Sequence, residues 1–134
     1  MSESPRVLID TNVIIDITGG DPDWMQWSAS ALADCESAFV NPIVFTELCY
    51  FKSSPGAVEE LLRSLAVEYQ EVPKDALFLA VQAYRQYRRR GGLKMAPLPD
   101  FFIGAHGVVL GVPVLTRDPT RYRTYFPTLS LVCP

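Results

Sequence analysis

Apolar and polar positions along the 134-residue chain follow two kinds of pattern. Short apolar runs rich in β-branched residues predict buried strands, and longer stretches with apolar residues three and four positions apart predict helices. The expected strands cover residues 6–9, 37–40, 67–72, 113–116 and 129–132. The expected helices cover residues 11–18, 57–66, 74–90, 100–110 and 119–125, and two more open at Asp21-Pro22 and Asn41-Pro42. Alternating strands and helices predict an α/β fold with a parallel sheet between two helix layers. We expect one domain spanning residues 1–134.

Four acidic residues lie at the ends of apolar segments or within them, where a surface role does not readily explain an acid. Asp10 and Asp118 each close an apolar run at a strand-to-helix junction. Glu47 lies within an apolar helical stretch, and Asp100 directly precedes another. Ligands of parallel sheets bind outside the carboxyl ends of the strands, so these acids can meet there. Buried carboxylates that meet are costly without a cation, and a hard divalent metal such as Mg²⁺ or Mn²⁺ suits them.

Each acid also has a simpler explanation. Asp10, Asp100 and Asp118 could cap the helices that follow them. Glu47 could pair with Lys52, although its apolar neighbours three and four positions away place it at the core or its rim. The remaining acids look like solvated surface, except that Asp16 follows Asp10 on one helix and could contact groups around the site.

Composition narrows the function further. Three widely spaced cysteines and one histidine, His106, argue against a zinc site, a disulfide framework or a nucleophilic triad, and His106 is expected to be structural. No apolar run is long enough to span a membrane, and residues 1–5 lack signal-peptide features, so we expect a cytoplasmic protein.

Charge divides the chain in two. Residues 1–75 hold 13 acidic and 4 basic residues, whereas residues 76–134 hold 8 basic residues and only two acids, Asp100 and Asp118. This asymmetry favours a polyanionic substrate beside a metal. Basic residues precede the loop that delivers Asp100, and the arginines around Asp118 are interleaved with Tyr122 and Tyr125. Arginines with aromatic rings on which bases can stack are typical of grooves for single-stranded RNA. The residues expected to bind RNA are Arg89, Arg90, Arg117 and Arg121. A basic helix end stabilised by the helix dipole explains residues 88–90 equally well.

Four segments carry a resemblance to a known family. They are residues 7–12 (VLIDTN), 41–48 (NPIVFTEL), 100–106 (DFFIGAH) and 114–118 (VLTRD). In this order they resemble the PIN-domain ribonucleases, and the VapC-type toxins of bacterial and archaeal toxin–antitoxin pairs most of all. The resemblance spans nearly the whole chain.

The resemblance implies a Mg²⁺- or Mn²⁺-dependent endoribonuclease that is a homodimer and is inhibited by a cognate antitoxin protein. Asp10, Glu47, Asp100 and Asp118 match the family's acidic quartet, which holds the metal and carries the catalysis. The same resemblance gives catalytic roles to Thr116, a hydroxyl near the metal, and to Asn12, a polar residue after the first acid. Many members carry a further acid or Asn where this chain has Pro119-Thr120, which puts a second metal position in doubt.

Other classes fit less well. Haloacid-dehalogenase-like enzymes require an Asp where this chain has Asn12, and receiver domains require an acidic pair that is missing here. The stronger alternative is a PIN-like module that binds RNA or a protein without cleaving. Four converging acids favour the nuclease over that module, and metal titration distinguishes the two.

Overall fold

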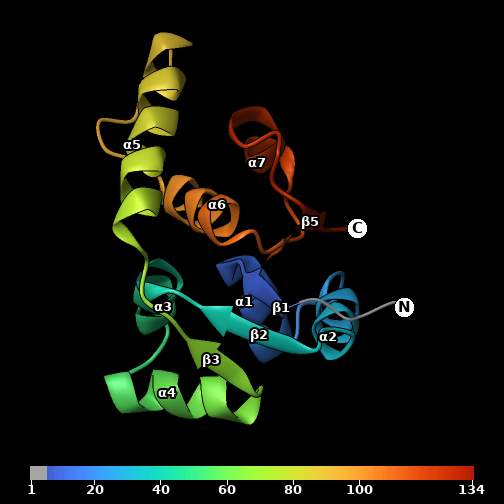
Figure 1. Ribbon diagram of the computed structural model, residues 1–134. Coiled ribbons are helices and arrows are strands. Elements are labelled where there is room, and N and C mark those ends of the chain that lie inside the picture. The colour runs from blue at the N-terminus through green and yellow to red at the C-terminus, as the bar shows by residue number, and fades with distance from the viewer. Residues whose placement is uncertain (1–5) are drawn as a thin grey trace.

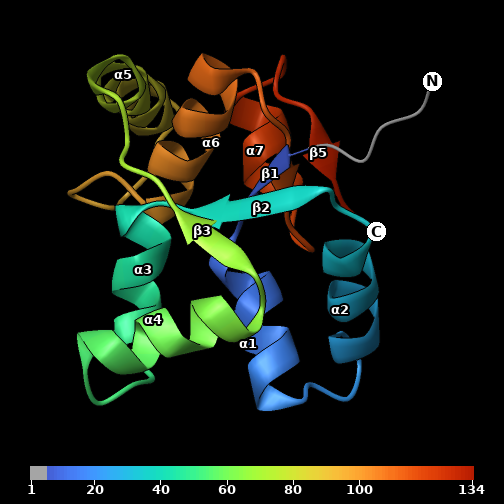
Figure 2. The same ribbon diagram turned by 60° about the horizontal axis from the view of Figure 1, so that its bottom comes forward.

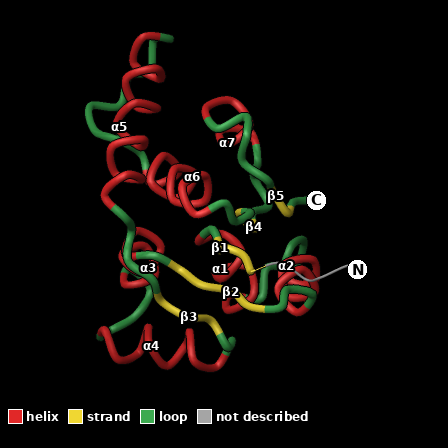
Figure 3. Tube along the Cα trace, in the orientation of Figure 1, coloured by secondary structure: helices red, strands yellow, loops and turns green. Residues whose placement is uncertain are grey.

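The centre of the molecule is a five-stranded parallel sheet (Figures 1 and 3). A computed structural model describes residues 6–134, so the expectation about targeting features in residues 1–5 lies outside the described part. The strands are β1 (Arg6–Ile9), β2 (Ser37–Val40), β3 (Val67–Tyr69), β4 (Val114–Leu115) and β5 (Leu131–Val132), in the order β3-β2-β1-β4-β5. The predicted parallel sheet is thereby confirmed. The strands β3, β4 and β5 are shorter than the sequence predicted.

The residues of the middle strand, β1, form an unbroken apolar run because both faces of the strand are buried. Val7, Leu8 and Ile9 are completely buried, because helices cover both faces of the sheet. Leu8 pairs with Val114 of β4, and Val7 pairs with Ala38 of β2. The carboxyl ends of β1, β2 and β4 therefore reach the same edge of the sheet.

Seven helices of the described chain form the two outer layers (Figure 2). One layer contains α1 (Thr11–Gly19), α2 (Met25–Ala33), α3 (Pro42–Cys49) and α4 (Pro55–Ser64). The other contains α5 (Lys74–Arg89), α6 (Pro99–Leu110) and α7 (Thr120–Tyr125). This arrangement confirms the predicted three-layer architecture. Within residues 6–134, no helix is long and apolar enough to cross a membrane.

Capping side chains fix the starts of α1, α3 and α4, and the first two begin where the sequence predicted. The Asp10 side chain accepts a hydrogen bond from the Thr11 backbone at the start of α1. Asn41 caps α3 by accepting from the backbone N–H groups of Ile43 and Val44. Ser54 caps α4 with Pro55 in its first turn, so α4 begins two residues earlier than predicted.

Two of the expected starts are wrong. Asp100 does not cap α6, because that helix begins at Pro99 and Leu98 occupies the cap position. Asp100 therefore lies within the first turn. The helix expected at Asp21-Pro22 begins only at Met25, because the Asp21 carboxylate accepts backbone hydrogen bonds at 2.8 and 2.9 Å that fold the preceding residues into a turn.

Candidate functional site

The four predicted acids line one pocket of about 250 Å³ at the carboxyl edge of the sheet. Its lining residues are Asp10, Thr11, Asn12, Ile15, Glu47, Asp100 and Asp118. Asp10 follows β1, and Asp118 lies three residues beyond β4. Glu47 comes from α3 and Asp100 from α6, so helices of both layers contribute to the pocket.

Asp10 is the most buried of the four, with 6% of its surface exposed. Its Oδ1 accepts the Thr11 backbone N–H at 2.7 Å. Its Oδ2 accepts the hydroxyl groups of Thr116 and Tyr122, each at 2.9 Å. Asp10 thus caps α1 as the simpler explanation proposed, and it also anchors a hydrogen-bond network in the pocket.

Glu47 lies half-buried at the rim, as its apolar neighbours predicted. Its Oε1 accepts a hydrogen bond of 2.6 Å from the Thr11 hydroxyl. Lys52 is absent from the ion pairs of residues 6–134, so pairing with Lys52 does not explain this glutamate. A link between α1 and α3 therefore holds Glu47 beside Asp10.

Asp100 and Asp118 come from the C-terminal half of the chain, Asp100 from α6 and Asp118 from the segment between β4 and α7. The Asp100 carboxylate lies 3.5 Å from the Arg121 guanidinium of α7. The Asp118 backbone N–H donates to the Thr116 hydroxyl at 3.0 Å. That turn orients the residues after β4 and explains Asp118 better than a helix cap, because the cap position of α7 is Pro119.

Thr116 and Asn12 connect these segments. Thr116 is fully buried, and its hydroxyl donates to Asp10 while accepting from Asp118. Asn12 donates to the Thr116 hydroxyl at 3.3 Å and accepts the Arg117 backbone N–H at 3.4 Å. Both residues therefore lie where they can orient the acids around the pocket.

The electrostatics of the pocket disfavour its negative charges. Burial raises the pKa of Asp10 and of Glu47, while hydrogen bonds from neighbouring hydroxyl groups act against the rise. Burial, and then the charge of Asp10, raises the pKa of Asp100 to about 6, with Arg121 acting in the opposite direction. A bound cation would relieve this strain between like charges.

The donor set suits a hard divalent cation, since it consists of carboxylate oxygens with hydroxyl and amide groups around them. Among residues 6–134, however, no three acidic, histidine or cysteine side chains stand close enough to form a ready-made metal-binding group. The acids therefore share a pocket without being preassembled around one point. A cation shared by these acids would require their side chains to rotate toward it.

The arginines expected to bind RNA differ in how they are held. Arg117 donates from Nε to Asp16 at 2.7 Å and lies over the Trp24 ring. Arg121 is near Asp100. Arg90, just after α5, lies 5.3 Å from the centre of the Tyr125 ring, and Arg89 is exposed at the end of α5.

Sequence reasoning missed two hydroxyl groups of the site. Thr11 was read only as part of a helix, and its hydroxyl donates to Glu47. Tyr122 was noted as a possible RNA-stacking residue, yet it is 1% exposed and donates to Asp10. The available signal was a tyrosine four residues after Asp118, one helical turn along a short helix. Asp16 contacts Arg117 and Ser28 rather than the acids themselves.

His106 is buried in α6, as expected for a structural residue. Its Nδ1 lies 3.2 Å from the Asn41 side-chain nitrogen. Burial lowers the pKa of His106 to about 4, so the ring is neutral near pH 7 and can accept from Asn41. It supports the cap of α3, which carries Glu47.

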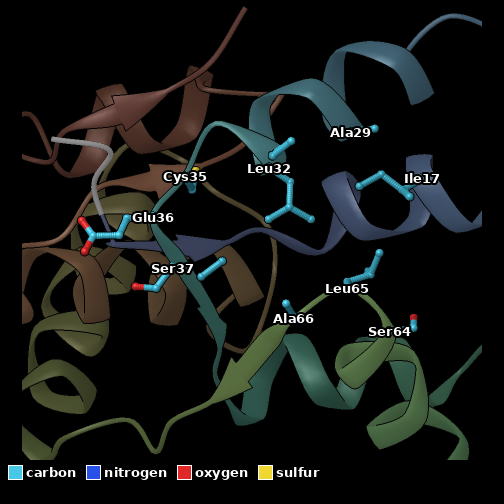
Figure 4. A pocket seen from close by; sticks show the side chains of 11 residues that line it. Ile17, Ala29, Leu32, Cys35, Glu36, Ser37, Ser64, Leu65 and Ala66 are labelled. Atoms are coloured by element: carbon cyan, nitrogen blue, oxygen red, sulfur yellow. The ribbon is translucent and has the colours of Figure 1, made fainter. Parts of the chain in front are cut away.

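A larger pocket of about 390 Å³ lies at the opposite edge of the sheet, beside the first residues of β2 and β3 (Figure 4). Ile17 and Leu32 contribute apolar side chains from α1 and α2, and Leu65 follows α4. The acid in its lining is Glu36. This pocket lacks the gathering of polar groups that marks a catalytic site.

The chain is an α/β protein with a parallel sheet between two helix layers and four acids in a pocket at the carboxyl edge of that sheet. Comparison with known proteins shows the family to which it belongs. The PIN domain model matches residues 7–127, so the chain belongs to the PIN domain family. No curated protein sequence matches this chain.

Several solved structures share the fold at low sequence identity. A chain of VapBC2 from Rickettsia felis, solved with a DNA fragment from their promoter, is 17% identical with a TM-score of 0.69, covering 96% of this chain and 98% of that one. A toxin–antitoxin complex from Klebsiella pneumoniae is 20% identical with a TM-score of 0.69, covering 94% and 95%. FitAcB from Neisseria gonorrhoeae is 19% identical with a TM-score of 0.63, covering 93% and 95%. This chain thus resembles the VapC toxins of VapBC complexes in fold.

Proposed function

We propose that this protein is a metal-dependent endoribonuclease. The observation that carries the proposal is the pocket in which Asp10, Glu47, Asp100 and Asp118 converge at the carboxyl edge of a parallel sheet. Membership of the PIN domain family supports it, because the members of that family are typically nucleases.

Under this proposal Asp10, Glu47, Asp100 and Asp118 hold Mg²⁺ or Mn²⁺, directly or through water. When bound, such a cation supplies Lewis-acid activation of the scissile phosphate and of the attacking water. Asp10 and Asp118 are the best candidates for direct ligands, because Asp10 directly follows the central strand β1 and a turn just after β4 holds Asp118. Thr116 and Asn12 orient these acids through the hydrogen bonds described above. The products would carry 5′-phosphate and 3′-hydroxyl ends.

RNA would be held by basic and aromatic groups beside the acids. Arg121 of α7 contacts Asp100 of the pocket. Arg90, just after α5, lies over the ring of Tyr125, which is also on α7. Arg89 extends this surface along the end of α5. Arg117 has its Nε engaged by Asp16, which leaves its terminal nitrogens as the groups for a phosphate.

The biological role we propose is that of a cytoplasmic toxin with a cognate antitoxin as its protein partner, acting as a homodimer. The support is that similar folds occur in structures described as a toxin–antitoxin complex and as VapBC assemblies. An antitoxin would explain how a cell tolerates an RNA-cleaving enzyme.

A second candidate function is a PIN-like module that binds RNA or protein without cleaving. The observation in its favour is that the described acids are not preassembled for a metal. The raised pKa values of Asp10, Glu47 and Asp100 favour the nuclease instead: burial, and at Asp100 also the charge of Asp10, disfavours their negative charges, and a cation in the pocket would offset that cost.

The test is cleavage of a mixed pool of structured RNAs by purified protein with Mg²⁺, with Mn²⁺ and with EDTA. Wild type should cleave with either metal and stop with EDTA. Asp10→Asn should be inert, whereas Asp23→Asn, an exposed residue before α2, should cleave like wild type. If wild type and Asp10→Asn are equally inert and neither binds metal, the non-catalytic module is the better description.

A further inference from the structure

The Tyr122 hydroxyl has an unusual position for a group on the last helix of the chain. Tyr122 is 1% exposed, and its hydroxyl donates to Asp10 Oδ2 at 2.9 Å across 112 residues of sequence. A buried tyrosine hydroxyl requires a hydrogen-bond partner, and the acid after β1 provides it. The bond therefore joins α7 directly to Asp10, the most buried of the four acids in the pocket.

The hydrogen bonds around Asp10 are distributed unevenly between its two oxygens. Oδ2 accepts from Tyr122 and from Thr116, which occupies both of its lone pairs. Oδ1 accepts only the Thr11 backbone N–H at 2.7 Å, which leaves one lone pair uncommitted. Asn12 Nδ2 also donates to Oδ2, at a longer 3.4 Å, so the side-chain donors gather on this oxygen and Oδ1 remains the freer one.

We propose that Tyr122 is a positioning residue for Asp10, which it restricts to binding a divalent cation through Oδ1 alone. This inference rests on the proposed metal-dependent function and deepens it. Thr116 does not suffice for this, because removing the Tyr122 hydroxyl takes away one of the two short bonds on Oδ2 and opens that oxygen to the cation. Groups that orient a metal ligand in this way commonly change metal affinity 10- to 100-fold when they are removed.

The neighbouring contact of α7 strengthens the case that this helix organises the pocket. Arg121, the residue before Tyr122, lies 3.5 Å from Asp100. Consecutive residues of α7 thus contact two acids, one directly after β1 and one in α6. The Tyr122–Asp10 bond thus satisfies the buried hydroxyl and also holds an acid of the pocket.

The test is the dissociation constant for Mn²⁺, measured by electron paramagnetic resonance of free Mn²⁺, for wild type, Tyr122→Phe and Tyr125→Phe. Tyr122→Phe keeps the ring in the core and removes only the hydroxyl. Tyr125→Phe is the matched control, because Tyr125 lies on the same helix and packs on Phe101 without a hydrogen bond from its hydroxyl among the described residues. We expect binding about tenfold or more weaker for Tyr122→Phe, and unchanged binding for Tyr125→Phe.

Each other outcome has a distinct meaning. Equal affinities in all three proteins would overturn the positioning role and leave the proposed nuclease intact. Equal weakening in both variants would also overturn it, because it would reveal a general disturbance of α7. No Mn²⁺ binding by wild type would overturn both proposals. If Tyr122→Phe folds only marginally, the rise of its unfolding midpoint with Mn²⁺ concentration gives the same dissociation constant by linkage.

Discussion

The guanidinium of Arg117 and the carboxylate of Asp16 form a hydrogen-bonded ion pair with an Nε–Oδ2 distance of 2.7 Å. Asp16 is 2% exposed and also accepts a hydrogen bond from the Ser28 hydroxyl at 3.0 Å. These contacts join α1, α2 and the segment between β4 and α7. Arg117 lies between Thr116 and Asp118 in the sequence. The Arg117–Asp16 ion pair therefore holds in place the segment that brings Thr116 and Asp118 to the pocket.

Asp16→Asn should therefore destabilise the protein. The variant loses a charged acceptor that is nearly inaccessible to water, and hydrogen bonds to charged groups contribute roughly 1.5–3 kcal/mol each. We expect the free energy of unfolding in urea to fall by about that amount. Asp23→Asn is the control, since this exposed residue should change stability by less than about 0.5 kcal/mol. Equal effects of the two substitutions would show that the Arg117 pair contributes nothing to stability.

Asp100 should give the metal-free protein a measurable pH dependence of stability. Its folded-state pKa is about 6, above the ordinary value of 3.8, so the folded state binds the proton more tightly than the unfolded state. Its charge therefore opposes folding above about pH 6, and that opposition disappears as the pH falls toward 4. In EDTA, Asp100→Asn should be more stable than wild type at pH 7.5, and the difference should shrink by pH 5.

The comparison with Asp100→Asn is necessary because His106 acts in the opposite direction. The pKa of His106 is lowered from 6.5 to about 4 by burial, so its contribution weakens the fold as the pH falls through the same range. Both proteins contain His106, and subtracting their unfolding free energies removes its effect. A difference that stays constant from pH 7.5 to pH 5 would show that Asp100 has an ordinary pKa.

Gly104 of α6 should not tolerate a side chain. A Cβ atom there would overlap the ring of Phe126, which is buried directly after α7. Gly104→Ala should lower the free energy of unfolding by about 1–3 kcal/mol, because a packed core resists added volume. Gly56→Ala in α4 is the matched control, since its Cβ would meet nothing closer than 3.9 Å and alanine favours helices by about 0.5–1 kcal/mol. Equal denaturation midpoints for the two variants would contradict this packing.

The fold was largely predictable because its signals are local. The apolar run before Asp10 and the Asn41-Pro42 cap each identify an element without knowledge of the rest of the chain. The same holds for Asp10 and Asp118, since the strands before them end at one edge of a parallel sheet, and for Glu47, whose apolar neighbours along α3 place it at the rim of the core. The helix starts at Met25 and Pro99 were missed, because an aspartate before a helix can equally form a turn or lie inside the first turn.

The rest of the site depends on contacts between distant segments. Nothing in the sequence near Tyr122 indicates Asp10, because 112 residues separate them and α7 alone does not reveal which face is buried. The pairing of Arg117 with Asp16 is equally non-local. Local patterns can therefore identify which acids line the pocket, and only the packed structure shows which groups hold them.

The central claim, that Asp10, Glu47, Asp100 and Asp118 gather around one divalent cation, is tested most directly by crystals grown with Mn²⁺. An anomalous difference map should show a peak in the pocket, on the order of 2–2.5 Å from carboxylate oxygens that include those of Asp10 and Asp118. Asp118→Asn crystals should lose or weaken that peak. A map without a peak in this pocket at saturating Mn²⁺, or with the same peak in Asp118→Asn, would contradict the account.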